Sequence, residues 1–118
     1  MILIVSSVYA TSSQYNIILP SFSQDTTLTV GSKSTSNWGA TNYISSMGGD
    51  WHEMFTWIDK EVNNNFQAVT DRVMCLEGLI CYIYYNSMPI IGSKLRSRGH
   101  TPDFFAPNIQ AKGTIDFK

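Results

Sequence analysis

Charged residues are scarce in this chain of 118 residues. They make up 14% of the sequence, against about 25% in an ordinary soluble domain. The net charge is −1, which excludes the uniformly basic surface of a general nucleic-acid coat, and we expect no nucleic-acid partner. No stretch of about 18 successive apolar residues occurs, so we expect no membrane span. The hydrophobic content of 43% is enough for one folded core.

The sequence also lacks the motifs of common enzyme classes. His52 and Glu53 begin an H-E-x-x-H pattern, but threonine follows at position 56, where the second zinc ligand would stand. His100 is the only other histidine. No G-x-S-x-G nucleophile motif and no glycine-rich phosphate loop after a strand occur. We therefore expect no catalytic residues, no metal and no cofactor.

Cysteine is equally scarce, because Cys75 and Cys81 are the only two. Six residues apart in one predicted helix, they would lie far apart around its axis. We expect two buried thiols in a reducing compartment. The apolar start, Met1–Ala10, lacks the basic residues of an export signal and is short for one, so a strand or an anchoring arm is favoured there over a signal peptide.

Uncharged polar residues take the place of the missing charges, above all in a first zone, residues 1–49. Three short segments of high β propensity interrupt the Ser-rich stretches of this zone: Ile2–Val5, Tyr15–Leu19 and Thr26–Val30. We expect strands there and a loop over residues 31–49. Within that loop, Trp38 and Tyr43 could form a surface that contacts a sugar or a peptide, although stacking on the next element is favoured.

The second zone, residues 50–86, has the strongest periodicity in the chain. Asp50 and Glu53 fit a capping box, which predicts the start of a helix. Ten apolar residues then recur at steps of three or four, with one stutter near Asn63–Asn65, as in the seam of a coiled coil. These residues, which we expect to form an oligomer interface, are Trp51, Phe55, Ile58, Val62, Phe66, Val69, Val73, Leu76, Ile80 and Ile83.

A helix over this zone would be roughly 54 Å long, at 1.5 Å for each of about 36 residues. The rest of the chain is too short to cover it as one compact domain. Either the helix breaks at the asparagine run, or it packs against copies of itself. β-Branched residues at both seam positions favour a homotrimer over a parallel dimer.

The third zone, residues 87–118, indicates an extended basic arm that ends in a strand over Thr114–Phe117. If the arm is extended, four cationic or titratable side chains point to one side, and they could bind phosphates or an acidic protein. Pairing with the acidic second zone, which has six acids and two bases, is favoured instead. The four residues are Lys94, Arg96, Arg98 and His100.

Two adjacent aromatic residues of the arm, Phe104 and Phe105, lie between Pro102 and Pro107. An extended segment bounded by prolines and carrying paired aromatics can dock into a groove of a neighbouring molecule. Folding back onto its own subunit is the alternative. The residues that we expect to contact a partner are thus Phe104 and Phe105, together with Lys94, Arg96 and Arg98.

Two segments, Asn37–Tyr43 and Trp57–Val73, resemble the anchor and coil segments of tailed-phage fibre and accessory virion proteins. The likeness lies in low charge, abundant Ser, Thr and Asn, and an asparagine-bearing coil flanked by β-structure. The resemblance implies a homotrimeric structural component of a capsid or tail. No functional residue follows from it.

We therefore predict one α+β domain: a β-rich segment over 1–49, a long helix over about 50–86 and an extended arm over 87–118, assembled as a trimeric helical bundle. The predicted function is that of a non-enzymatic structural protein, such as a short phage fibre, a fibre base or a decoration protein. Its partners would be itself and other structural proteins of a virion, with assembly in the cytoplasm. The alternative is a small binding module or inhibitor that captures a partner protein or a ligand.

Overall fold

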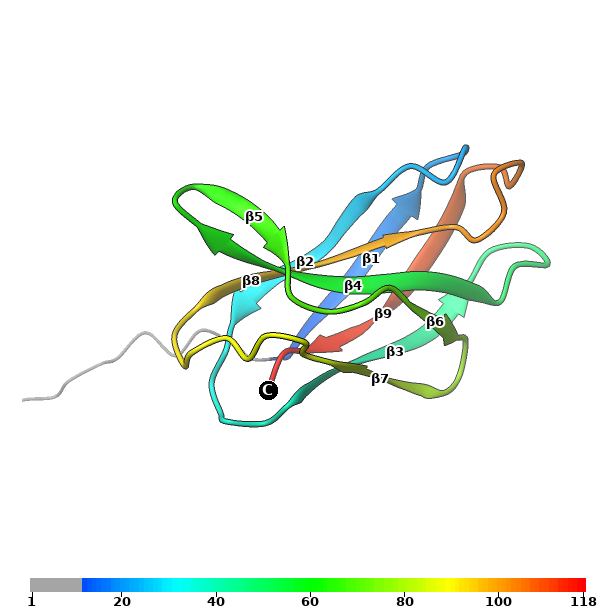
Figure 1. Cartoon of the computed structure of the whole chain (residues 1–118). Helices are drawn as coiled ribbons and strands as arrows, with labels where there is room; N and C mark the ends of the chain where they lie inside the picture. Colours follow the sequence, from blue (N-terminus) through cyan, green and yellow to red (C-terminus); the bar gives the residue numbers. More distant parts are fainter. Residues whose placement is uncertain (1–11) are drawn as a thin grey trace, which may run out of the picture.

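The computed structural model describes residues 12–118, where the chain is built from strands and contains no α-helix (Figure 1). The predicted strand Ile2–Val5 lies outside the described residues. The strands are β1 (Ser12–Leu19), β2 (Thr26–Ser32), β3 (Gly39–Met47), β4 (Glu53–Val62), β5 (Asn65–Ala68), β6 (Val73–Leu76), β7 (Ile80–Tyr84), β8 (Lys94–His100) and β9 (Ile109–Asp116). The predicted α+β class is therefore wrong, and the chain is all-β.

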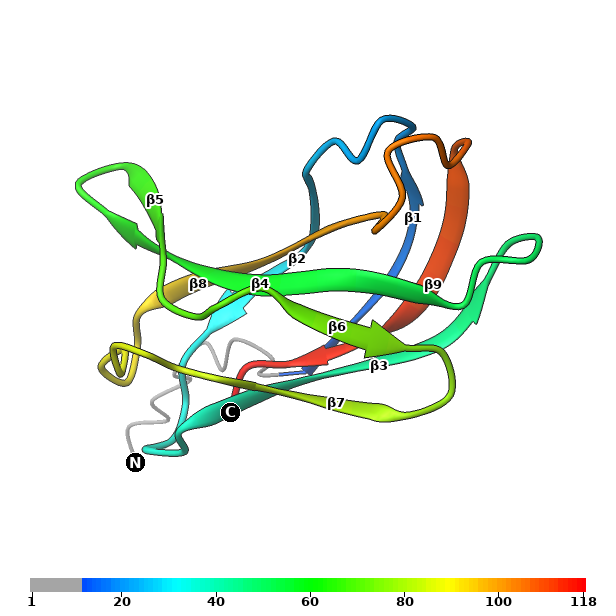
Figure 2. The same ribbon diagram turned by 45° about the vertical axis from the view of Figure 1, so that its right-hand side comes forward.

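The strands form two antiparallel sheets that pack face to face (Figure 2). Sheet A has the order β1-β9-β3-β7, and sheet B has the order β2-β8-β4-β5. Strand β6 also pairs with β4, and β5 and β6 follow one another along the same edge of that strand. Counting β5 and β6 as one interrupted strand gives two four-stranded sheets in the order of a jelly roll.

Alternation along the strands places the core between the two sheets. In β9, every second residue from Ile109 to Ile115 is buried, and the residues between them face outward. Strands of both sheets contribute fully buried aliphatic side chains, as expected where two sheets share one core. Those with no exposed surface include Leu19, Ile44, Ile58, Ile83, Leu95 and Ile115.

A chain of buried hydrogen bonds links the two sheets through this core. The Tyr15 hydroxyl donates to Asn42 Oδ1 at 2.8 Å, and the Asn42 amide donates to Thr56 Oγ1 at 2.9 Å. Tyr15 reaches Asn42 by crossing β9 at Gly113, where any Cβ would collide with the phenol. Each buried polar group in this series has a hydrogen-bond partner. The series therefore fixes the register of β1, β3 and β9 without leaving a donor unsatisfied.

A second buried polar cluster surrounds Lys33, which is 1% exposed. Its ammonium group donates to the backbone oxygens of Asn37 and Lys118 and lies 5.0 Å from the centre of the Tyr85 ring. The Tyr85 hydroxyl donates to the backbone oxygen of Phe117 at 2.6 Å. This cluster ties the β2–β3 loop to the residues that follow β9.

The predicted helix over 50–86 is replaced by β4 to β7. Asn63 and Asn64 have φ angles of 52° and 65°, and they form the two-residue turn between β4 and β5. Asparagine tolerates this left-handed conformation, and two such residues in a row are typical of a tight hairpin. The asparagine run that looked like a stutter in a seam is therefore a chain reversal.

The ten seam residues do not lie along one line, so the predicted coiled coil is wrong, and the predicted oligomer interface has lost the seam on which it rested. Ile58, Val69 and Ile83 are buried in the core of the same chain. Trp51, Phe55, Val62, Phe66 and Val73 are partly buried on several strands and loops, whereas Leu76 and Ile80 are exposed. The pattern misled because residues 54–58 of β4 are apolar on both sides of the strand except at Thr56, which hides the alternation of a strand.

In the other two zones, some predicted elements are confirmed and others are wrong. The strands expected at Tyr15–Leu19 and Thr26–Val30 are confirmed as parts of β1 and β2. The loop expected over 31–49 is wrong in its second half, since β3 begins at Gly39. The extended arm over 87–118 contains two strands of the sandwich, β8 and β9, and most of the predicted Thr114–Phe117 strand falls within β9.

The two cysteines form a disulfide, which corrects the expectation of two free thiols. Cys75 lies in β6 and Cys81 in β7, with their Cα atoms 5.3 Å apart. The chain turns between them at Gly78, which has a φ of 82°. The six-residue separation forbids a bond within a helix but not across a chain reversal. The bond joins an edge strand of sheet B to an edge strand of sheet A.

Removing the disulfide should lower the free energy of unfolding by about 2 kcal/mol, the loop-closure value for so short a loop. Urea unfolding of the wild type with and without dithiothreitol measures this difference. The Cys75→Ala/Cys81→Ala variant is the control, because reductant should not change its stability. Two thiols that react with iodoacetamide in the native protein before reduction would contradict the bond.

Stability should fall at alkaline pH, because burial raises the pKa of both Tyr15 and Tyr85 well above the ordinary 10.0. Above that pH the unfolded chain loses phenolic protons that the folded chain keeps, so unfolding becomes more favourable. Once both groups titrate, the slope is about 2.7 kcal/mol per pH unit.

Burial lowers the pKa of Lys33 from 10.5, which has the opposite sign: its contribution rises with pH until the unfolded chain is also neutral. The slope due to the tyrosines is therefore unopposed only above about pH 10.5. Urea unfolding between pH 9 and pH 12 measures it, and Tyr85→Phe should remove about half of it. An unchanged slope in that variant would contradict the assignment.

Candidate functional site

Strand β8 presents the predicted row of cationic side chains on the outer face of sheet B. Lys94, Arg96, Arg98 and His100 alternate with the buried residues Leu95, Ser97 and Gly99. The extended conformation expected for this segment is confirmed. Its neighbours in the sheet are β2 on one side and β4 on the other.

Carboxylates on β4 pair with the first two cations of the row. Arg96 Nε lies 2.8 Å from Asp59 Oδ2, and the guanidinium group also stacks over the Phe66 ring, 4.0 Å from its centre. Lys94 Nζ lies 3.2 Å from Glu61 Oε2. Asp59 is 5% exposed, so its charge depends on Arg96 for compensation. The favoured alternative, in which the cations of this row pair with acids of the second zone, is therefore confirmed for Lys94 and Arg96.

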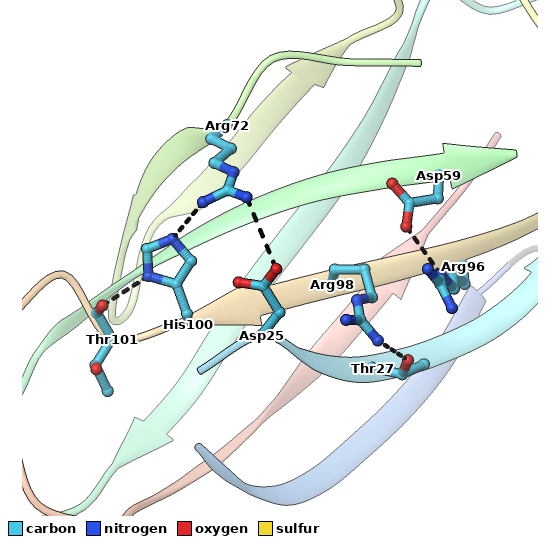
Figure 3. A network of polar contacts seen from close by, with 8 residues as sticks. All are labelled: Asp25, Thr27, Asp59, Arg72, Arg96, Arg98, His100 and Thr101. Carbon is cyan, nitrogen blue, oxygen red and sulfur yellow. Dashed lines mark hydrogen bonds and ion pairs between the residues drawn. The ribbon is translucent and has the colours of Figure 1, made fainter. Parts of the chain in front are cut away.

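Trp57 lies on the same outer face, yet it is 5% exposed because other side chains cover it. The Arg72 guanidinium lies 4.2 Å from the centre of its indole ring, and the His100 ring meets it edge-on at 5.5 Å. Arg72 also pairs with Asp25 at 3.7 Å and contacts His100 Nε2 at 3.0 Å (Figure 3). His100 Nδ1 faces the Thr101 carbonyl at 2.7 Å, so the ring contacts Arg72 through one nitrogen and the backbone through the other.

Arg98 is the remaining member of the row, and it donates to the Thr27 hydroxyl at 2.9 Å (Figure 3). It forms no ion pair among residues 12–118. The cations of sheet B therefore bind mostly to groups of their own chain, which leaves little free charge for phosphates.

The other residues predicted to dock, Phe104 and Phe105, are exposed at one end of the sandwich. They lie in the β8–β9 loop, beside Phe22 of the β1–β2 loop, and these two loops project from the same end (Figure 2). Ring centres are 5.3 Å apart for Phe22 and Phe104, and 5.4 Å apart for Phe104 and Phe105. Phe105 is 85% exposed, and the other two are 55% exposed. We call these three residues the aromatic tip.

Hydrogen bonds between the two loops hold the aromatic tip in place. The Ser23 hydroxyl donates to the Thr101 carbonyl at 2.8 Å, and the Ser21 amide donates to Asn108 Oδ1 at 2.7 Å. Within the second loop, the Phe105 amide donates to Asp103 Oδ1 at 2.9 Å. The phenyl rings are thus presented to solvent by ordered backbone.

Backbone strain at the aromatic tip also indicates a contact surface. Phe22 and Ser23 have φ angles of 64° and 50°, a region that a bulky residue such as phenylalanine rarely occupies. Such conformations cost about 1–3 kcal/mol each and persist where the surroundings impose them. An exposed ring on strained backbone adds nothing to the core, so the aromatic tip is the leading candidate for a contact surface.

Sequence reasoning found two members of the tip and missed the third. Phe104 and Phe105 stood out because prolines bound them, whereas Phe22 is a lone aromatic in a polar loop. Its place beside Phe104 follows from the pairing of β1 with β9 and of β2 with β8, which aligns the ends of the two loops.

Comparison of the chain with models of protein families, with curated proteins and with solved structures gives no match. Among residues 12–118 there is also no helix with the length and apolar character needed to cross a membrane.

The two arginines of the row should differ in their effect on stability. Arg96→Ala strands the buried Asp59 carboxylate and should cost about 1–3 kcal/mol, less than a fully buried pair because Arg96 is partly exposed. Arg98→Ala loses only its contact with Thr27 and should cost under about 1 kcal/mol. Thermal unfolding of both variants tests this, and equal losses would contradict the assigned pairing.

Proposed function

We propose that this chain is a non-enzymatic binding module that inserts its aromatic tip into an apolar groove of a partner protein. The observation that carries the proposal is the exposure of three phenylalanine rings on two loops that hydrogen-bond to each other. This is the alternative function named from the sequence, in which the chain captures a partner.

The energetics support a role in binding. Burying one phenylalanine side chain contributes about 1.5–3 kcal/mol, and Phe105 makes almost none of this gain in the free chain. Because the loops are ordered before contact, little conformational entropy remains to be lost when the rings dock. Aromatic residues are also typical hot spots at the centres of protein interfaces.

Charge around the aromatic tip favours a protein over an anionic membrane. The two loops, residues 20–25 and 101–108, contain Asp25 and Asp103 but no lysine or arginine. A surface that binds anionic lipid combines apolar residues with lysine and arginine. An apolar groove with a neutral or basic rim fits these loops better.

The disulfide adds a proposal about where the protein works. Disulfides persist in oxidising surroundings, such as secretory compartments and cell or virion surfaces. We therefore place the folded chain in such surroundings rather than in a reducing cytoplasm. The predicted homo-oligomer and the place in a virion stay predictions, and they have lost the coiled coil on which they rested.

Phe105→Ala should weaken partner binding without loss of stability, because the removed ring is almost fully exposed. A photo-crosslinking amino acid at position 105 first identifies the partner, which is then purified. We expect the affinity for this partner to fall by about 30-fold, the effect of a hot-spot residue. Titration calorimetry measures the affinity, and thermal unfolding checks the fold.

Ile90→Ala is the matched control, since Ile90 is 74% exposed in a different loop and should leave the affinity unchanged. Equal binding by Phe105→Ala and wild type would refute the role of the aromatic tip. Co-sedimentation with phosphatidylcholine vesicles that depends on Phe105 would assign the tip to lipid instead and would also refute the proposal.

A further inference from the structure

The outer faces of the two sheets differ in chemistry. Most charged side chains of the described strands lie on sheet B, where Lys94 pairs with Glu61 and Arg96 with Asp59. On the outward side of sheet A, the described strands carry only two charged side chains, Lys112 and Asp116. The rest of that face consists of tyrosine, aliphatic, amide and hydroxyl side chains.

Two tyrosines of β7 form an aromatic platform on this face. Tyr82 and Tyr84 are 54% and 66% exposed, and their ring planes differ by 15° with centres 6.4 Å apart. Tyr84 lies over Gly39 of the neighbouring strand, where an added Cβ would come within 3.3 Å of the ring. The missing side chain of Gly39 thus lets the tyrosine ring lean across the sheet.

A polar hollow lies further across the same sheet, over the three strands other than β7. It holds about 440 Å³ and spans β3, β9 and β1. Strand register places Ile80, Tyr43, Thr114 and Gln14 in one row across the four strands. The lining residues are Gln14, Tyr15, Asn16, Tyr43, Ser45, Lys112, Gly113 and Thr114.

Side chains in the hollow have unused hydrogen-bonding groups. Asn16 accepts from Gln110 through its oxygen at 2.9 Å, which leaves both amide hydrogens of Asn16 for a ligand. Among the described residues, the side chains of Gln14, Tyr43 and Thr114 make no hydrogen bond to one another or to other groups. Neutral donors and acceptors thus surround one aromatic wall on a rigid sheet.

We infer that the outer face of sheet A binds a neutral oligosaccharide, with sugar rings stacked on Tyr82 and Tyr84 and hydroxyl groups bound in the hollow at Gln14 and Asn16. A pyranose ring has an apolar C–H face and a rim of hydroxyl groups, and this face of the protein offers a partner for each. The near absence of charge excludes a polyanionic ligand, for which Lys112 alone is available. The inference is independent of the aromatic tip, which lies on other elements.

Four neutral hexasaccharides serve as probes: cellohexaose, maltohexaose, fully N-acetylated chitohexaose and mannohexaose. We expect at least one to bind the full chain with a Kd of about 1 mM or lower in titration calorimetry. Tyr82→Ala/Tyr84→Ala should weaken that binding by about tenfold or more, since stacking on exposed rings is lost. Gln14→Ala should weaken it as well, by removing a donor and an acceptor in the hollow.

Phe105→Ala is the control, because it alters the aromatic tip and should leave oligosaccharide binding unchanged. The tyrosine variant should keep the wild-type unfolding temperature, since both rings are exposed. Failure of all four probes to bind at millimolar concentration would overturn the inference. Oligosaccharide binding that is unchanged in Tyr82→Ala/Tyr84→Ala would also overturn it. So would a result in which this variant keeps oligosaccharide binding and loses only the binding of the partner protein at the aromatic tip.

Discussion

The hydrogen-bond chain from Tyr15 through Asn42 to Thr56 is the constraint on which the other features depend. It fixes how β1, β9 and β3 are aligned, because Tyr15 reaches Asn42 only where Gly113 lets it pass. A shift of one residue would turn every side chain of a strand to the opposite face. The composition of the outer face of sheet A therefore follows from these buried contacts.

This alignment separates two kinds of surface. On sheet B, cations, carboxylates and aromatic rings bind one another, and the buried Asp59 has its partner in Arg96. On sheet A and at the aromatic tip, apolar and neutral polar groups face solvent without such partners. Function resides in sites carried on a fold, and these open surfaces are where this sandwich can carry one.

The sequence predicts the parts of this structure that depend on local chemistry. High β propensity indicated the strands β1 and β2, and alternation placed Lys94 to His100 on one side of an extended segment. Alternation did not reveal β4, because four of the five residues from Met54 to Ile58 are apolar and only Thr56 is polar. Neither face of this part of the strand therefore looks polar in the sequence. The approach of Phe22 to Phe104 could not be predicted, because it joins segments that are distant in the sequence. The Cys75–Cys81 bond was missed because a helix was expected where the chain reverses at Gly78.

The position of the aromatic tip has a consequence for avidity. Its two loops project from one end of the sandwich, so a molecule held there covers neither sheet (Figure 2). A protein bound to its partner through the aromatic tip would keep the tyrosine platform exposed. The platform would then be confined near the surface that carries the partner. Confinement of this kind raises the effective concentration of a weak second site to the millimolar range. Contacts too weak to measure between free molecules would then be occupied on a crowded surface.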